Sequence, residues 1–160
     1  MSGFWDDLKG AFIDGKKDSD IFKMKENVKV NVRDYHPKIM VAWDECLKGN
    51  LEIAKWLIQN GYEELVNVRA SLFGEQRANE KLKEKGFVQF IAFVAAIREQ
   101  EGAKDWLQKN KFDQLYAMAI AITGDENGWK WIRQNSSEDI FMITQTIKYI
   151  VDNQRTIRRG

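Results

Sequence analysis

The sequence predicts an all-α protein: a short right-handed αα-hairpin solenoid of four 25-residue repeats, followed by a C-terminal capping helix. Three observations lead to this prediction. Residues of the same kind recur every 25 positions over residues 40–139, and a fifth copy opens at Ile140. Gly49, Gly74 and Gly124 interrupt the copies at the same place. Apolar residues within each copy follow the period of a helix, and self-similarity at a fixed spacing is typical of stacked repeats.

Each copy is expected to form two short helices, because its apolar pattern stops at the interruption and then resumes. In the second copy we expect these helices at 65–73 and 77–85, and the last helix of the chain at 138–154. A glycine directly after a helix can adopt the left-handed cap conformation. The apolar residues that recur in the first helix of the copies are Leu65, Phe90, Leu115 and Ile140, then Val68, Phe93, Met118 and Ile143, then Leu72, Ile97, Ile122 and Ile147.

Residues 1–39 precede the helical-repeat domain of residues 40–160, and their beginning predicts an amphipathic helix. Such a short helix is marginal alone in water, so it should lie against another surface. It either docks on the repeats or lies in a partner's groove or on a membrane, although its acidic first turn disfavours anionic lipid. Its apolar residues, which we take as candidate protein-binding residues, are Phe4, Trp5, Leu8 and Phe12.

An extended N-terminal arm is expected before the repeats. Val28, Val30 and Val32 alternate with polar residues, which is typical of a strand with one face in water. No second strand is evident, so this segment is either an arm laid on the helices or half of a sheet completed by another chain. His36 and Pro37 then favour a helix start, because proline suits the first helical position.

Residues 42–61 read AWDECLKGNLEIAKWLIQNG: an alanine-bearing helix, then Gly-Asn, Leu-Glu-Ile, Leu-Ile and Asn-Gly. This stretch resembles the middle of an ankyrin repeat. The family's period is about 33 residues and its repeats open with Thr-Pro-Leu-His, which none of the four copies has. The resemblance therefore implies an ankyrin-like helical solenoid without the β-hairpin fingers. By analogy it implies a protein-binding scaffold without catalysis.

The first helices of the third and fourth copies, FIAFVAAI and LYAMAIAI, are apolar on every side. A helix of this kind is expected to be covered all round, whereas neighbouring copies and the second helix of the same copy cover only three sides. On the fourth side, alanine either lets helices approach closely or lies under the N-terminal arm. Alternatively this side is a partner-binding or self-association surface. Its residues are Ala92, Ala95, Ala96, Ala117 and Ala121.

Composition excludes several kinds of site. The chain has 25 basic and 24 acidic residues, so it lacks the basic character of a nucleic-acid-binding domain. The single Cys46 cannot form an internal disulfide, and the N-terminus lacks the pattern of a secretion signal, which indicates a cytoplasmic protein. One histidine and one cysteine do not suffice for an ordinary zinc site. We expect Cys46 to be buried and His36 to cap a turn.

No constellation of residues suggests catalysis, a cofactor, a metal ion or a small-molecule substrate. The tryptophans at 56, 106 and 131 share one repeat position, so we expect them to pack. The sequence favours a non-enzymatic adaptor or scaffold that binds a protein partner, or itself, through the inner-helix face and the N-terminal arm. The alternative is a structural subunit of a larger assembly, anchored through residues 1–33.

Overall fold

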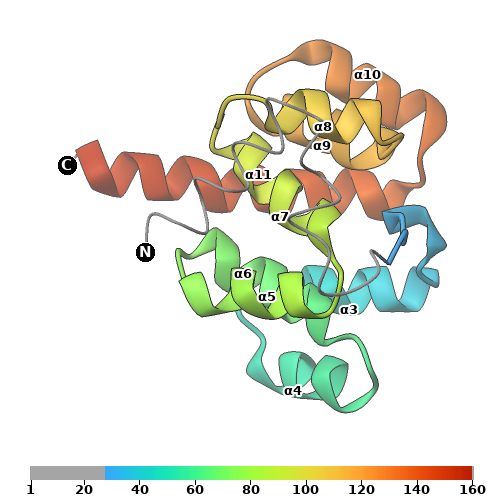
Figure 1. The fold of residues 1–160 in the computed structure, drawn as a ribbon, viewed down its shortest axis with the longest axis vertical. Coiled ribbons are helices and arrows are strands. Elements are labelled where there is room, and N and C mark those ends of the chain that lie inside the picture. The colour runs from blue at the N-terminus through green and yellow to red at the C-terminus, as the bar shows by residue number, and fades with distance from the viewer. Residues whose placement is uncertain (1–27, 160) are drawn as a thin grey trace.

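The computed structural model describes residues 28–159 (Figure 1). These residues form a short 3-10 helix and nine α-helices, and they include no strand, so the predicted all-α fold is confirmed. Although the last helix has 22 residues, no helix in this range is both long and apolar enough to cross a bilayer. The elements are η1 (Val32–Asp34), α3 (Pro37–Leu47), α4 (Leu51–Gln59), α5 (Glu63–Leu72), α6 (Gln76–Glu84), α7 (Val88–Ile97), α8 (Ala103–Lys109), α9 (Asp113–Ile122), α10 (Glu126–Asn135) and α11 (Glu138–Arg159).

The helix boundaries follow the spacing seen in the sequence. Helices α5, α7, α9 and α11 begin at residues 63, 88, 113 and 138, which are 25 residues apart. The turns that follow α3, α5 and α9 each contain a glycine with positive φ: Gly49, Gly74 and Gly124. After α7 the same position is Glu99, with a φ of 57°. The left-handed conformation is therefore required at this turn even where the residue is not glycine.

The first helix of each pair belongs to an inner layer. We call α3, α5, α7, α9 and α11 the inner helices, and α4, α6, α8 and α10 the outer helices. Neighbouring inner helices contact each other along the chain, and α11 also contacts α3, which closes the cycle (Figure 1). Each outer helix contacts the inner helix before it and the one after it.

Three positions of every inner helix fill the centre of the molecule. Their side chains are at most 2% exposed, and burying each of these large apolar groups stabilises the fold by about 1.5–3 kcal/mol. The recurring apolar residues recognised in the sequence, which begin with Leu65, Val68 and Leu72, are therefore confirmed as core, and Met40, Trp43 and Leu47 of α3 occupy the same three positions. These residues are Met40, Leu65, Phe90, Leu115 and Ile140; Trp43, Val68, Phe93, Met118 and Ile143; and Leu47, Leu72, Ile97, Ile122 and Ile147.

The alternation of valines before α3 does not produce a strand. The backbone N–H of Val28 donates to the carbonyl of Gly86 at 2.9 Å. The Gln89 side-chain amide donates to the carbonyls of Val28 and Val30 at 2.8 and 2.9 Å. Val32, which begins η1, is buried. The alternation thus reflects a segment whose valines face the helices, and not a sheet.

Two expectations about single residues are confirmed. His36 is the N-cap of α3, because its Nδ1 accepts the backbone N–H of Lys38 at 3.1 Å and Pro37 is the first helical residue. Cys46 is a buried free thiol, and burial raises its pKa.

The tryptophans that share a repeat position differ in their burial. Trp106 is buried and stacks on Phe112, with ring centroids 5.9 Å apart. Trp131 is half-buried against the core, whereas Trp56 is 43% exposed. The expectation that these side chains pack is therefore confirmed for Trp106 and Trp131 but is wrong for much of Trp56.

Candidate interaction surface

The alanines that the sequence suggested as a partner surface are all interior. Ala117 is 2% exposed, and Ala92, Ala95, Ala96 and Ala121 are 0% exposed. The expected exposed face therefore does not exist at these positions. The other suggested binding residues, Phe4, Trp5, Leu8 and Phe12, lie outside the described residues.

Close packing of an outer helix explains the burial of two of these alanines. Gly128 of α10 lies so near α9 that an added Cβ would be 2.5 Å from the carbonyl oxygen of Ala117 and 2.6 Å from the nitrogen of Ala121. The position of Gly128 is Ala103 in α8 and Ala78 in α6, and both are buried. Small residues on facing helices thus let the inner and outer layers approach, which is the first alternative considered from the sequence.

Helices α11 and α3 meet through a partly buried polar contact. The Thr146 hydroxyl of α11 donates to Oδ1 of Asp44 at 2.6 Å. The ammonium of Lys48 lies 2.8 Å from Oδ2 of the same carboxylate, which is only 2% exposed as a residue. A buried carboxylate is stable only when it is paired and hydrogen-bonded. The contact therefore helps to hold the first and last inner helices together.

Within residues 28–159, no outer helix covers the outward side of the α11–α3 pair, whereas outer helices cover the other pairs of inner helices. In α11, Phe141 packs against Trp129 of the preceding outer helix, with ring centroids 5.2 Å apart. The same position in α7 is Ile91, which is buried, but in α3 it is Val41, which is 47% exposed. Position 41 therefore faces the place where an outer helix would precede α3. None is present there in residues 28–159.

The same contrast is seen on α11. Met142 and Thr146 follow Ala117 and Ala121 by 25 residues, yet they are half-buried, whereas the two alanines are buried under α10. One turn further on, Tyr149 is 69% exposed. We define the open face as the side of α3 and α11 that carries Val41, Met142, Thr146 and Tyr149.

A groove of about 410 Å³ borders the open face on the side of α10. Its walls are aromatic, with Trp129 on α10 and Phe141 and Tyr149 on α11. The Arg133 guanidinium lies 5.3 Å from the centroid of the Phe141 ring. Lys148 also lines the groove and pairs with Asp152 at 2.9 Å. Aromatic walls with charged edges are common at surfaces that bind other proteins.

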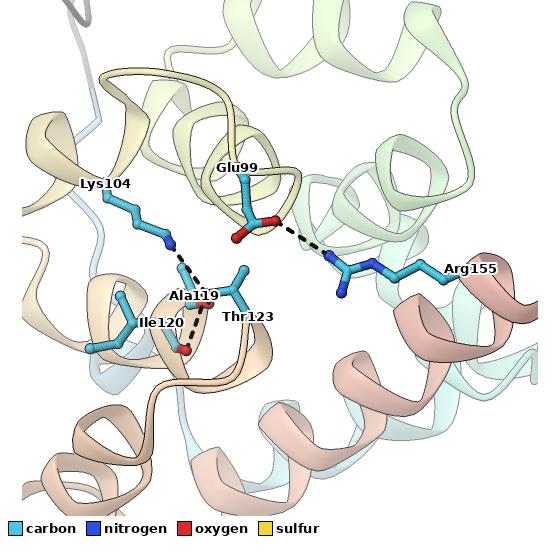
Figure 2. Close-up of polar contacts among 6 residues, drawn as sticks. All are labelled: Glu99, Lys104, Ala119, Ile120, Thr123 and Arg155. Carbon is cyan, nitrogen blue, oxygen red and sulfur yellow. Dashed lines mark hydrogen bonds and ion pairs between the residues drawn. The ribbon is translucent and has the colours of Figure 1, made fainter.

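The equivalent place one copy earlier is bridged by direct contacts (Figure 2). Lys104 of α8 and Thr123 at the end of α9 precede Trp129 and Lys148 by 25 residues. The Lys104 ammonium donates to the Thr123 hydroxyl at 3.2 Å, and this hydroxyl lies 3.1 Å from the carbonyl oxygen of Ala119. Between α10 and α11, an indole and a lysine take these places, and the groove lies between the two helices.

Figure 2 also shows that α11 reaches across the ends of other inner helices. Nη2 of Arg155 lies 3.9 Å from Oε2 of Glu99, just after α7. The Gln154 amide donates to the carbonyl of Leu72, at the end of α5, at 3.2 Å. Tyr149 occupies the turn position at which the other inner helices have ended, but α11 continues through it. Within the described residues the chain therefore does not turn back to form a fifth outer helix.

A second apolar surface lies on α4. Leu51 is 71% and Ile58 is 45% exposed, and residues seven apart share one face of a helix. We call Leu51, Lys55 and Ile58 the α4 face. In the other copies the residues at the positions of Leu51 and Ile58 are polar: Gln76, Glu101 (in the turn before α8) and Glu126, and Lys83, Gln108 and Arg133. Packing within the fold thus does not require apolar residues at these positions.

The buried ionisable groups near the start of α3 and α5 have structural partners. The Tyr35 hydroxyl donates to Oε2 of Glu64 at 2.8 Å, and both side chains are largely buried. Burial, together with the charge of Glu64, raises the pKa of Tyr35 well above its ordinary value of 10.0. This pair ties the segment before α3 to α5. No group of three or more His, Cys, Asp and Glu side chains in residues 28–159 is placed to hold a metal ion.

The described part of the chain is thus an all-helical protein with a closed cycle of inner helices and two exposed apolar surfaces. Compared with known protein families, with curated proteins and with solved structures, the chain matches none. The resemblance of residues 42–61 to an ankyrin repeat therefore stays a prediction.

Proposed function

We propose that this chain is a non-enzymatic protein–protein interaction module that binds a helix of a partner protein on its open face. The observation that carries the proposal is the unequal cover of the inner helices. Within residues 28–159, each pair of inner helices that is adjacent along the chain has an outer helix against it, and the pair α11 and α3 has none. Exposed Val41 and Tyr149 and the aromatic groove beside them support this function, because helices commonly bind by laying an apolar face against such a surface.

The proposal also includes the repeat architecture of the chain. We take the helix pairs to be four 25-residue repeats of a short solenoid, with α11 as the capping helix that brings its two ends together. Support comes from the recurring helix starts and from the core positions that the inner helices share. A scaffold role is further supported by the structural use of the buried Asp44 and Glu64. The buried free thiol of Cys46 is compatible with work in a reducing compartment such as the cytoplasm.

A displayed library of amphipathic helices of the length of α10 tests the proposal against the full-length chain. We expect binders whose affinity falls about tenfold or more for Val41→Glu and for Tyr149→Glu, because each change puts a charge into the apolar contact. Gln108→Glu on α8 is the matched control, since it adds the same charge at an exposed site away from the open face. A library that yields no binders, or only binders unaffected by both open-face changes, would contradict the proposal.

A second candidate function is a structural subunit of a larger assembly, and the α4 face favours it. We propose a second copy of this chain as the occupant of that face. If two α4 helices pair antiparallel about a two-fold axis, Leu51 meets Ile58 of the second copy. Lys55 then comes close to Glu52 of the second copy, and the reverse contact follows by symmetry. Glu52 and Lys55 of one α4 helix are thus complementary to the same pair on the other.

Sedimentation velocity of the full-length chain over a range of concentrations tests this second candidate. We expect a dimer that dissociates in the double variant Leu51→Lys, Ile58→Lys. A variant with Glu101→Lys and Gln108→Lys, 50 residues further along the repeats in the turn before α8 and in α8 itself, is the control and should remain dimeric. A wild-type chain that stays monomeric throughout would rule out the α4 face as a dimer interface.

A further inference from the structure

We infer that the helix bound on the open face carries a small residue followed four positions later by leucine or isoleucine, and that it runs antiparallel to α11. This inference rests on the proposed function. It uses the outer helices of the same chain as the template, because each of them lies where the partner helix would lie on another pair of inner helices.

The outer helices share a two-residue pattern. One position in each holds an aliphatic side chain that is fully buried, and these residues are Leu57, Leu82, Leu107 and Ile132. Four positions earlier, on the same side of the helix, α6, α8 and α10 have a small buried residue: Ala78, Ala103 and Gly128. The aliphatic side chain inserts between layers, and the small residue lets the two backbones approach. Only α4 departs from the pattern, with Ile53 at the small position.

The open face requires the small residue more strongly than the filled positions do. The surface of α9 on which α10 packs consists of Ala117 and Ala121. Even on these small residues, a Cβ on Gly128 would lie 2.5–2.6 Å from backbone atoms. On α11 the same positions hold Met142 and Thr146, whose side chains extend further from the helix. A partner helix of ordinary bulk would therefore be held away from α11. Glycine, alanine or serine at the facing position allows contact.

The direction of the partner helix follows from the short turns of the chain. Only three residues separate Ile122 at the end of α9 from Glu126 at the start of α10, and such short connections join antiparallel helices. A helix that copies this arrangement on the open face begins near Tyr149 and ends near the start of α11. One flank of it then lies along the groove, where Trp129 and Phe141 receive its apolar side chains.

The test uses a peptide that copies residues 125–137, titrated into the labelled full-length chain and followed by NMR. A side-chain lactam between Glu126 and Lys130 of the peptide, which are exposed in α10 and one turn apart, holds the helix, because an isolated helix of this length is marginal in water. We expect saturable binding with shifts on α3 and α11 that Val41→Glu in the protein abolishes. In the peptide, Gly128→Leu and Ile132→Lys should each weaken binding about tenfold or more. The substitution Asn127→Ala, on the exposed side of the peptide helix, is the matched control and should leave binding unchanged.

The outcomes separate the inference from the function on which it rests. If the Gly128→Leu peptide binds the open face as tightly as the copy does, the small-residue rule is overturned while the helix-binding function stands. If none of the peptides binds and the displayed library also fails, both are overturned. A peptide of residues 1–15 is titrated in parallel. Tighter binding of that peptide at the same residues would assign the open face to the chain's own N-terminal segment and overturn the inference of a separate partner.

Discussion

Gly128→Ala tests the close packing of α10 on α9. The burial of Ala117 and Ala121 depends on this packing, and so does the inference that the partner helix carries a small residue. The added Cβ would lie 2.5 Å from the carbonyl oxygen of Ala117 and 2.6 Å from the nitrogen of Ala121. An ordinary carbon–oxygen contact is about 3.3–3.6 Å, so α10 must move away by roughly 0.8–1.1 Å or the backbone of α9 must yield. Both atoms belong to the backbone of a helix, so neither can rotate out of the way.

The expected magnitude is a difference between two opposing effects. Adding a methyl group to a packed core typically costs about 1–3 kcal/mol. Replacing glycine by alanine inside a helix favours folding by roughly 0.8–1.0 kcal/mol. The difference spans about 0–2 kcal/mol. We therefore expect Gly128→Ala to lower the free energy of unfolding by about 1 kcal/mol, the middle of this range, which corresponds to a fall in Tm of roughly 2–4 °C for a domain of this size.

Chemical denaturation followed by circular dichroism measures the change, and Asn127→Ala is the control. Asn127 is exposed in the same turn of α10, so its replacement gains helix propensity without a new contact. We expect the control to be as stable as the wild type or slightly more stable. A Gly128→Ala variant that matches or exceeds the wild type would refute the reasoning, because it would mean that the two helices are not held at this distance.

Three further predictions follow from other contacts and are measured by denaturation of matched variants. Trp106→Ala should cost about 3–5 kcal/mol by leaving a core cavity, whereas Trp56→Ala, at the same repeat position but 43% exposed, should cost clearly less; equal losses would contradict the difference in burial. Tyr35→Phe should cost about 1–3 kcal/mol at neutral pH, because the buried Glu64 carboxylate loses its donor. The folded-state pKa of Tyr35 is raised, so its contribution is present below the unfolded pKa of about 10 and is lost as the pH rises above it. The wild type should therefore lose its advantage over Tyr35→Phe in alkaline solution, and a constant difference would argue against this pair. Glu99→Gly should stabilise the fold by about 0.5–1 kcal/mol, since glycine adopts the positive φ without strain; a loss of stability would mean that the contact with Arg155 matters more.

The local structure was predictable because it depends on patterns that each short segment carries by itself. A helix that must bury one side needs apolar residues at helical spacing, so residues such as Phe90, Phe93 and Ile97 indicated both the helix and its buried side. The cap at His36 and Pro37 was equally local. The alternation of Val28, Val30 and Val32 left two interpretations open for the same reason, and the contacts with Gly86 and Gln89 favour the arm laid on the helices. Alternation shows only that one side of an extended segment is covered, and it does so whether the cover is a strand or a row of helices.

The sequence alone therefore determined the all-α class, the paired helices, their 25-residue spacing and most of the core. Only the tertiary structure decided that α11 returns to α3, and with it which surfaces remain exposed. Closure depends on the rotation between successive helix pairs, which accumulates along the chain and is set by side-chain packing at every contact. The contact of Asp44 with Thr146 joins residues 102 positions apart, and no local sequence pattern predicts such a contact. For this reason Ala92 and Ala117 looked like a surface in the sequence and are interior, whereas nothing in the sequence pattern indicated that Val41 lies on the open face.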